Sequence, residues 1–219
     1  MTDLAIIVPV IRRPAAAPRF MASLAASSVE VPVYAITDQA DSSTRRAWLH
    51  AGATVMTSTR GHTFPQKAQF AYEHTTEPWL LLIGDDVDFK EGWFDHAAVW
   101  MHNRRVCLIA TNDMHNPFVL GGTHATHPII RRSWINDAGA SWDGPGFVAH
   151  LGYTHACVDS EWSARAWEDD VFQFVEGCKI EHLHPTWGTG RRDPVYELGM
   201  KHYHQDHELF RTRQEKYAI

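Results

Sequence analysis

Cysteine is scarce in this chain, and its three cysteines, Cys107, Cys157 and Cys178, are widely spaced. An odd number at such spacing fits neither a zinc knuckle nor a disulfide framework, so we expect a reducing, cytoplasmic environment. The apolar stretch near the N-terminus is short, is interrupted by Pro9, and has no basic region ahead of it. We therefore expect neither a signal peptide nor a membrane span.

Basic charge is also in short supply, with 20 Lys and Arg residues against 26 Asp and Glu and a net charge of −6. This balance argues against a general nucleic-acid binder, which carries a basic surface. The sequence has no internal repeat, linker or low-complexity segment. Its 219 residues, 44% of them hydrophobic, predict one domain with a substantial core. Histidine is abundant instead, at 15 residues, which permits metal binding.

Short apolar runs alternate with helical patterns through the first half of the chain. Strands are predicted at 4–11, 31–38, 53–58 and 79–84, and helices at 19–28, 42–52 and 65–75. This alternation predicts a parallel sheet with helices on both faces. Ligands of such sheets bind beyond the carboxyl ends of the strands. Arg12, Asp38 and the acidic residues 85–88 should therefore share one rim.

The second half is less regular. Helices are predicted at 94–101 and 158–170, strands at 106–112 and 179–185, and a charged helix from about 196. Residues 113–155 show little periodicity. In the run "HYHQDH" (202–207), no three possible metal ligands share one helix face, which favours a solvated helix. Glu161 and Arg165, four residues apart on one helix, predict an ordinary ion pair.

The stretch "LLLIGDDVDF" places Asp85, Asp86 and Asp88 directly after a buried strand. These carboxylates would repel each other unless a cation lay between them. Mg²⁺ and Mn²⁺ prefer such oxygen ligands and bind through one or two carboxylates together with substrate phosphates. A metal-bound diphosphate is one explanation; the other is a solvated turn in which an Asp caps the next helix.

Three segments, "AIIVPVIRRP", "ITDQ" and "LLLIGDDVDFKEGW", occur in an order and spacing that resemble the family 2-like glycosyltransferases of the GT-A fold. The resemblance covers residues 4–190. Among these glycosyltransferases, the sequence is most similar to the compact bacterial or phage type. It implies an α/β, Rossmann-like, mostly parallel central sheet flanked by helices, with a looser acceptor-side half. Residues 1–219 would form one such domain, with a nucleotide-sugar-binding half at 1–112 and an acceptor-side half at 113–219.

The resemblance assigns roles on the donor side. It implies that Pro9 lies near the nucleotide base, that Asp38 contacts the base or ribose, and that Asp86 is the metal-binding Asp. Gly84 stands where the family's first motif Asp is expected, so the sequence is similar to a "GDD" variant in which Asp85 or Asp88 assists. Phosphate, base or ribose contacts are also expected from Arg12, Arg13 and Lys67, which could otherwise be solvated charges.

On the acceptor side, "VDSEWSARAWEDD" is similar to the family helix that supplies the catalytic base, which places Asp159 in that role. "EHLHP" resembles the segment that returns a His to the metal. Because His182 and His184 alternate on a predicted strand, at most one should reach it. We choose His184, which borders the loop, so the expected metal set is Asp86, Asp88 and His184.

The sequence thus predicts a Mn²⁺- or Mg²⁺-dependent glycosyltransferase that uses a nucleotide-diphosphate sugar, first of all a UDP-sugar. The resemblance implies an inverting reaction with Asp159 as base, on an acceptor that is a protein, a modified nucleic-acid base or a small molecule.

Three alternatives remain. A non-catalytic nucleotide- or glycan-binding module would fit the glycine at position 84. A nucleotidyltransferase would need a Gly-rich loop after the first strand, where "VIRRPAAAP" has no glycine. A zinc hydrolase built on "HLHP" would leave the acidic cluster without a task.

Overall fold

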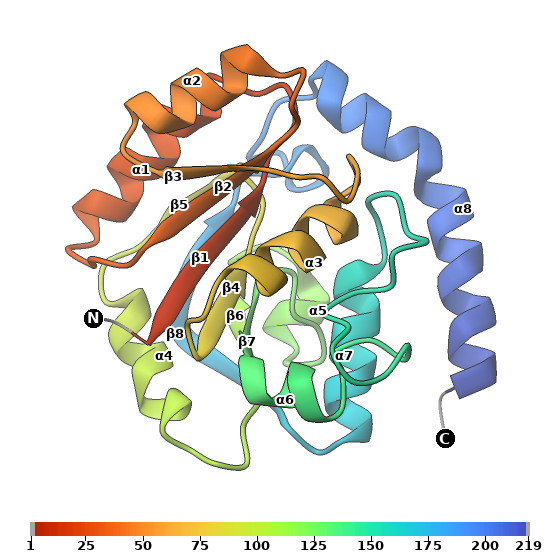
Figure 1. The fold of residues 1–219 in the computed structure, drawn as a ribbon. Coiled ribbons are helices and arrows are strands. Elements are labelled where there is room, and N and C mark those ends of the chain that lie inside the picture. Colours follow the sequence, from red (N-terminus) through yellow and green to blue (C-terminus); the bar gives the residue numbers. More distant parts are fainter. Residues whose placement is uncertain (1–2, 218–219) are drawn as a thin grey trace.

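The computed structural model describes residues 3–217, which form a mixed sheet in the order β3-β2-β1-β4-β7-β6-β8-β5, with helices on both faces (Figure 1). The strands are β1 (Leu4–Pro9), β2 (Val33–Thr37), β3 (Thr54–Thr57), β4 (Trp79–Leu82), β5 (Val87–Phe89), β6 (Leu108–Asn112), β7 (Pro128–Arg131) and β8 (Phe172–His182). The helices are α1 (Ala16–Ala26), α2 (Ser42–His50), α3 (Phe64–His74), α4 (Trp93–Met101), α5 (Pro117–Leu120), α6 (Arg132–Asp137), α7 (Val158–Glu168) and α8 (Pro194–Tyr217), with a 3₁₀ turn η1 (Pro185–Trp187).

The sheet is parallel from β3 to β4, and β6 also runs parallel to β8. Strand β7 runs antiparallel between β4 and β6, and β5 pairs antiparallel with β8 at the edge. The mostly parallel α/β architecture expected from the sequence is therefore confirmed.

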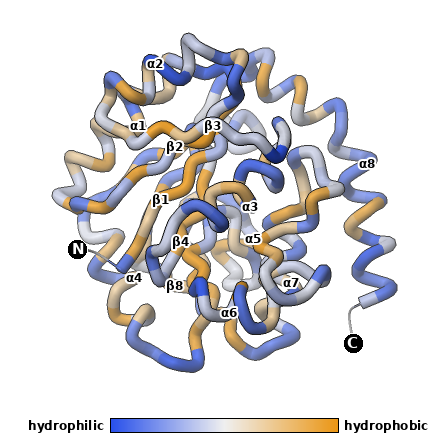
Figure 2. Tube along the Cα trace, in the orientation of Figure 1, coloured by the Kyte–Doolittle hydropathy of each residue, from blue (hydrophilic) through white to orange (hydrophobic). Residues whose placement is uncertain are grey.

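Both faces of the sheet are buried, which explains the uninterrupted apolar runs of the parallel strands. In β1, Ile6 packs in a core that includes Phe20 of α1 and Trp93 of α4. The neighbouring Ile7 packs on the opposite face, in a core with Phe70 of α3 and Trp162 of α7. Figure 2 shows the central strands as the most hydrophobic part of the chain and α8 as largely hydrophilic.

The predictions fail mainly around β8. This strand begins at Phe172, not at residue 179, and its exposed Glu176 and Lys179 interrupt the apolar pattern. Strand β5 was not predicted, because three residues beside an acidic cluster leave no periodicity to read. Within residues 3–217, none of the helices combines the length and apolar character that a membrane crossing requires.

Helix α8 runs along one edge of the molecule beside α7 (Figure 1). Its Arg213 donates hydrogen bonds from Nε and Nη2 to the buried Glu161 of α7, at 2.8 and 2.9 Å. The predicted ion pair between Glu161 and Arg165 is therefore wrong. Arg165 instead pairs with Glu168 and Asp169. The reason is that Glu161 faces inward, where it accepts hydrogen bonds from Arg213 of α8 and from the hydroxyls of Ser141 and Tyr153.

This buried pair should make stability depend on pH. Burial would raise the pKa of Glu161, but hydrogen bonds from Arg213 and Ser141 outweigh it and hold the pKa below its ordinary value of 4.5. The contribution of the pair is therefore present above pH 4.5 and is lost as the pH falls through the lowered pKa. Glu161→Gln should cost about 3–5 kcal/mol at pH 7. In urea unfolding, the difference in the free energy of unfolding between wild type and Glu161→Gln should narrow below pH 4.5. A difference that stays constant with pH would contradict the role of the Glu161–Arg213 pair.

Candidate functional site

The loops after β1, β2 and β4 meet at one rim, as the sequence predicted for this edge of the sheet. The acidic cluster there is neutralised by arginines of this chain. Arg13 Nη1 donates to Asp85 Oδ1 at 2.9 Å and lies 3.6 Å from Asp86 Oδ2. Arg19 Nη2 donates to the backbone oxygen of Asp85 at 3.0 Å. The guanidinium of Arg13 also binds Asp193, just before α8, with both carboxylate oxygens.

The two adjacent carboxylates differ in pKa and in exposure. Burial and the charge of Asp86 raise the pKa of Asp85 to about 6. Burial would also raise the pKa of Asp86, but His182 and Arg13 outweigh it and hold that pKa below its ordinary value. The side chain of Asp86 is 25% exposed and that of Asp85 only 6%. Asp86 is therefore the more acidic and the more accessible of the two, and the one that a cation can reach.

Gly84 has a steric reason to be glycine. A Cβ added there would lie 2.7 Å from Oδ1 of Asp86, closer than real Cβ contacts. An aspartate at position 84 would therefore displace Asp86 from the position seen here. The "GDD" sequence is consistent with one accessible carboxylate, where the stricter family motif has two.

His182 of β8 and His127, just before β7, lie near Asp86. His182 ends β8 with its Nε2 3.6 Å from Asp86 Oδ1, and the next backbone N–H donates to the oxygen of Asp86 at 2.8 Å. The ring of His127 packs edge-on against His182, 4.7 Å away. Burial and the neighbouring His182 lower the pKa of His127 to about 3, so it is neutral at pH 7. His127 Nε2 and His182 Nδ1 are both buried without a hydrogen-bond partner.

These residues fit a hard divalent cation with few protein ligands. Two ligands at right angles on Mn²⁺ or Mg²⁺ lie about 3 Å apart, close to the 3.6 Å between Asp86 Oδ1 and His182 Nε2. In the described part of the chain, no three His, Cys, Asp or Glu side chains form a group that could hold a metal by themselves. Phosphate oxygens and water would have to complete the coordination, as is usual for Mg²⁺.

The other two predicted metal ligands do not join Asp86. Asp88 pairs with Lys90 at 2.8 Å and lies opposite Glu181 in the β5–β8 ladder. His184 Nδ1 accepts from the backbone N–H of Thr186 at 3.3 Å and caps η1. Both side chains therefore already have local structural partners.

Asp38 and Lys67 form a second polar centre on the rim. Lys67 is fully buried, and its Nζ donates to the backbone oxygen of Val10 at 2.7 Å and lies 3.1 Å from Asp38 Oδ1. His62 Nδ1 contacts the same carboxylate oxygen at 2.8 Å. Burial lowers the pKa of Lys67 despite the opposing charge of Asp38. The structure thus brings together two residues that the sequence could only place on separate elements.

Two predicted donor-side residues are positioned by the backbone. Pro9 is buried at the end of β1, paired in register with Ile36. Arg12 is exposed in a left-handed conformation (φ 49°), and its backbone N–H donates to Asp41 at 2.8 Å.

Asp159 lies in the first turn of α7, where its Oδ1 accepts from the N–H of Ser160 at 2.9 Å. Its Oδ2 lies 3.0 Å from Nε2 of His124. Burial would raise the pKa of Asp159, but His124 outweighs it, so the pKa is lowered. The ring of His127, which packs against His182 beside Asp86, also feels the charge of Asp159, which acts to raise the pKa of His127. Asp159 is thus ionised and 32% exposed, as a proton acceptor requires.

Sequence reasoning missed several residues of this region. They are Arg19, His124, His127 and Asp193. The only sequence signal for them was the high histidine count, because their positions depend on how segments far apart in the chain pack together.

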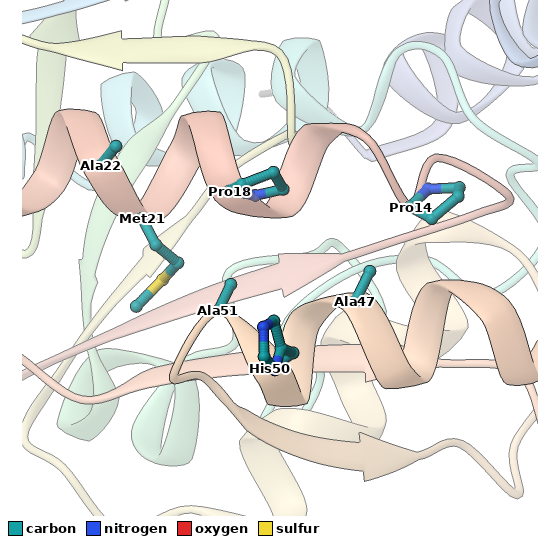
Figure 3. Close-up of a pocket in the computed structure, with 7 residues that line it drawn as sticks. All are labelled: Pro14, Pro18, Met21, Ala22, Ala47, His50 and Ala51. Atoms are coloured by element: carbon teal, nitrogen blue, oxygen red, sulfur yellow. The ribbon is translucent and has the colours of Figure 1, made fainter.

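A hollow of about 530 Å³ lies between α1 and α2, away from the acidic cluster (Figure 3). Its lining is Pro14, Pro18, Met21, Ala22, Ala47, His50 and Ala51. The lining is mostly apolar with one histidine, so it offers no group of side chains for catalysis.

Comparison with known proteins places the fold. No family model and no curated protein matches the chain. Glucosyl-3-phosphoglycerate synthase from Mycobacterium tuberculosis, in complex with Mn²⁺, UDP and glucosyl-3-phosphoglycerate, has a TM-score of 0.65 at 10% identity, covering 99% of this chain and 80% of that one. A mannosyltransferase from Pyrobaculum calidifontis, in complex with GDP-Man and Mn²⁺, has a TM-score of 0.65 at 11% identity, covering 82% and 56%.

The chain therefore has the GT-A-like glycosyltransferase fold. The synthase was also solved with Mg²⁺ and UDP, and in that form has a TM-score of 0.63 at 11% identity, covering 99% of this chain and 79% of that one.

Proposed function

We propose that this protein is a Mn²⁺- or Mg²⁺-dependent glycosyltransferase that uses a nucleotide-diphosphate sugar. The observation that carries the proposal is the pairing of the ionised Asp86 with His182 at the rim of a GT-A-like fold, with the ionised Asp159 in the same region. Residues 1–112 would bind the donor and residues 113–219 the acceptor. His182 takes the role of metal ligand that the sequence suggested for His184, and Asp88 remains outside the site.

The Asp38 carboxylate supports a base with a ring N–H. Its side chain is 14% exposed, and the fully buried Lys67 holds it in place. A carboxylate accepts from a ring N–H. Uracil and guanine carry such a group beside a carbonyl oxygen, whereas adenine and cytosine present a ring nitrogen that would face the carboxylate. We propose a UDP-sugar as the donor, with a GDP-sugar as the other candidate.

The reaction follows from these positions. When bound, the metal supplies a Lewis acid that neutralises charge on the leaving diphosphate. Asp86 and His182 would hold it, and Arg13 offers a further positive charge beside them. An acceptor hydroxyl oxygen attacks the anomeric carbon while the bond from that carbon to the diphosphate breaks. The diphosphate leaves with the electron pair, and Asp159 takes the hydroxyl proton. A single displacement of this kind inverts the anomeric centre.

His124 supports Asp159 as the base. Its Nε2 lies 3.0 Å from the carboxylate, and its Nδ1 lies 3.4 Å from the hydroxyl of Ser163. The imidazole thereby fixes the orientation of the carboxylate. The acceptor is a hydroxyl-bearing protein, modified nucleic-acid base or small molecule.

The proposal is tested by isothermal titration of the protein with UDP, GDP, CDP and ADP, each with and without Mn²⁺. We expect metal-dependent binding of UDP or GDP and release of the same nucleotide from the corresponding sugar donor. Binding without any turnover, of acceptors or of water, would instead favour the non-catalytic binding module. No metal-dependent binding of any nucleotide would reject the donor site.

Asp38→Asn tests the base contact. The amide keeps the shape but loses the charge that pairs with Lys67 and accepts from the base. A hydrogen bond to a charged group contributes about 1.5–3 kcal/mol, so we expect nucleotide affinity to fall by about 10- to 100-fold at unchanged metal dependence. Titration with UDP and GDP measures it. Asp95→Asn is the control, because it makes the same chemical change at an exposed residue of α4; equal losses in both variants would argue against a specific contact by Asp38.

A further inference from the structure

Helix α8 turns one face towards the acceptor-side segments. Gly199, Asp206 and Arg213 are spaced by seven residues, which places them on the same face of a helix. Asp206 and Arg213 are the buried residues of a helix that is otherwise mostly exposed. The expectation that "HYHQDH" would form a solvated helix is thus correct for the helix but wrong for Asp206, which faces the protein.

Asp206 binds three consecutive backbone amides of the loop that precedes α7. Its Oδ1 accepts from the N–H of Thr154 at 2.9 Å, and its Oδ2 accepts from those of His155 and Ala156, each at 2.8 Å. The carboxylate is 2% exposed. Amides that converge on one buried carboxylate have their positions fixed, because each charge-assisted hydrogen bond is strong and directional.

Gly199 allows α8 to approach this loop closely. A Cβ added at Gly199 would lie 2.7 Å from Cδ2 of His155, so the imidazole would have to move. Glycine within a helix is unfavourable relative to alanine. The close approach of α8 to His155 explains why glycine occupies this position. Arg213 also ties α8 to the first half of α7, through its hydrogen bonds to Glu161.

The held loop leads directly into the proposed base. Cys157 follows Ala156 in a left-handed conformation (φ 63°), which bulky side chains rarely adopt, and α7 begins at the next residue. Asp159 is three residues beyond Ala156. A shift of the loop at residues 154–156 should therefore also move the carboxylate of Asp159, because only the turn at Cys157 and one further residue separate them.

We infer that α8 positions the acceptor side of the site, and that Asp206 is the positioning residue that sets the first turn of α7 and thereby Asp159. This inference rests on the proposed function for its catalytic meaning. The side-chain hydrogen bonds of Asp206 hold the loop before α7, on the acceptor side, so its effect should be on turnover and not on nucleotide binding.

Asp206→Asn tests the inference, because the amide keeps the shape but turns an N–H₂ group towards backbone donors. Glu208→Gln is the matched control, since it removes one charge from an exposed position two residues away. For wild type and both variants, we would measure UDP and GDP affinity with Mn²⁺, kcat and KM for nucleotide release from UDP-glucose and GDP-mannose, and hydrogen exchange in residues 80–90 and 153–163.

In Asp206→Asn we expect exchange in residues 153–163 to rise at least tenfold and kcat to fall at least tenfold. Donor KM, nucleotide affinity and exchange in residues 80–90 should stay within about twofold of wild type, and Glu208→Gln should match wild type throughout. Unchanged exchange at 153–163 together with unchanged kcat would overturn the inference. So would a parallel loss of nucleotide affinity, which would show that Asp206 supports the whole fold.

Two provisions keep the outcome clear. If Asp206→Asn does not fold, Gly199→Ala replaces it, since that change pushes on the His155 ring of the same loop. It should lower kcat at unchanged donor affinity; unchanged kcat would then count against the inference. If wild type binds neither nucleotide, the proposed function fails, and the exchange comparison still decides whether α8 orders the loop.

Discussion

Asp86→Asn should abolish metal-dependent nucleotide binding and lower turnover by on the order of 10²- to 10³-fold. The amide preserves the shape of the side chain but removes the carboxylate that lies beside His182, has a lowered pKa and is accessible. Neutralising charge on a leaving diphosphate is worth several kcal/mol, and each 1.36 kcal/mol changes a rate tenfold. Titration of UDP with and without Mn²⁺, and rates of nucleotide release, measure the two effects.

Asp88→Asn is the matched control, because it makes the same chemical change two residues away on a side chain that pairs with Lys90. We expect its metal-dependent affinity and turnover to stay within about threefold of wild type. If Asp88→Asn lost as much metal-dependent affinity and turnover as Asp86→Asn, Asp88 would be a metal ligand, as the sequence predicted. The proposal that His182 is a ligand in place of His184 would then lose support. Omission of metal from the wild-type assay should reproduce the loss seen in Asp86→Asn.

Asp159→Asn should lower kcat by about 10²- to 10⁴-fold, the contribution of a positioned general base, while nucleotide affinity stays within about twofold. The carboxylate is ionised because His124 holds its pKa below the ordinary value. The base is thus available throughout neutral pH, and protonation of Asp159 should not lower the wild-type kcat until the pH drops below about 4. Steady-state kinetics with a donor and its acceptor, or with water as acceptor, give kcat and its pH dependence. Titration with UDP and GDP gives the nucleotide affinity.

Asp170→Asn serves as the control on the same segment. Asp170 is exposed and adopts a left-handed conformation (φ 56°) that asparagine tolerates well. Its kinetics should match wild type. A normal kcat in Asp159→Asn would assign the base to another group, and a loss of nucleotide affinity in parallel with kcat would show that Asp159 serves the donor instead.

The sequence predicted the donor-side rim because that rim depends on local patterns. The apolar runs before Pro9, Asp38 and Asp85 are buried on both faces, so each reads as a strand wherever it lies in the fold. Three parallel strands then bring their carboxyl ends together without further information. The GT-A-like architecture followed from the order of these segments.

The partners within the rim could not be predicted, because they come from distant segments. Arg13 reaches Asp193 across 180 residues, and Lys67 reaches the backbone oxygen of Val10 across 57. The choice of His182 over His184 depends on where β8 ends and η1 begins, which alternation along a strand cannot specify. The repulsion within the acidic cluster suggested a cation, and the structure supplies one from the chain itself, the Arg13 guanidinium.

The position of α8 in the chain also orders the assembly of the protein during synthesis. Asp206 lies 50 to 52 residues after the amides it binds. A nascent chain that has emerged from the ribosome as far as Asp193 contains every strand of the sheet and both Asp85 and Asp86. It lacks the carboxylate that holds the loop before α7. The donor side can therefore form first, and the catalytic half becomes complete only when Asp206, in the middle of α8, has also emerged.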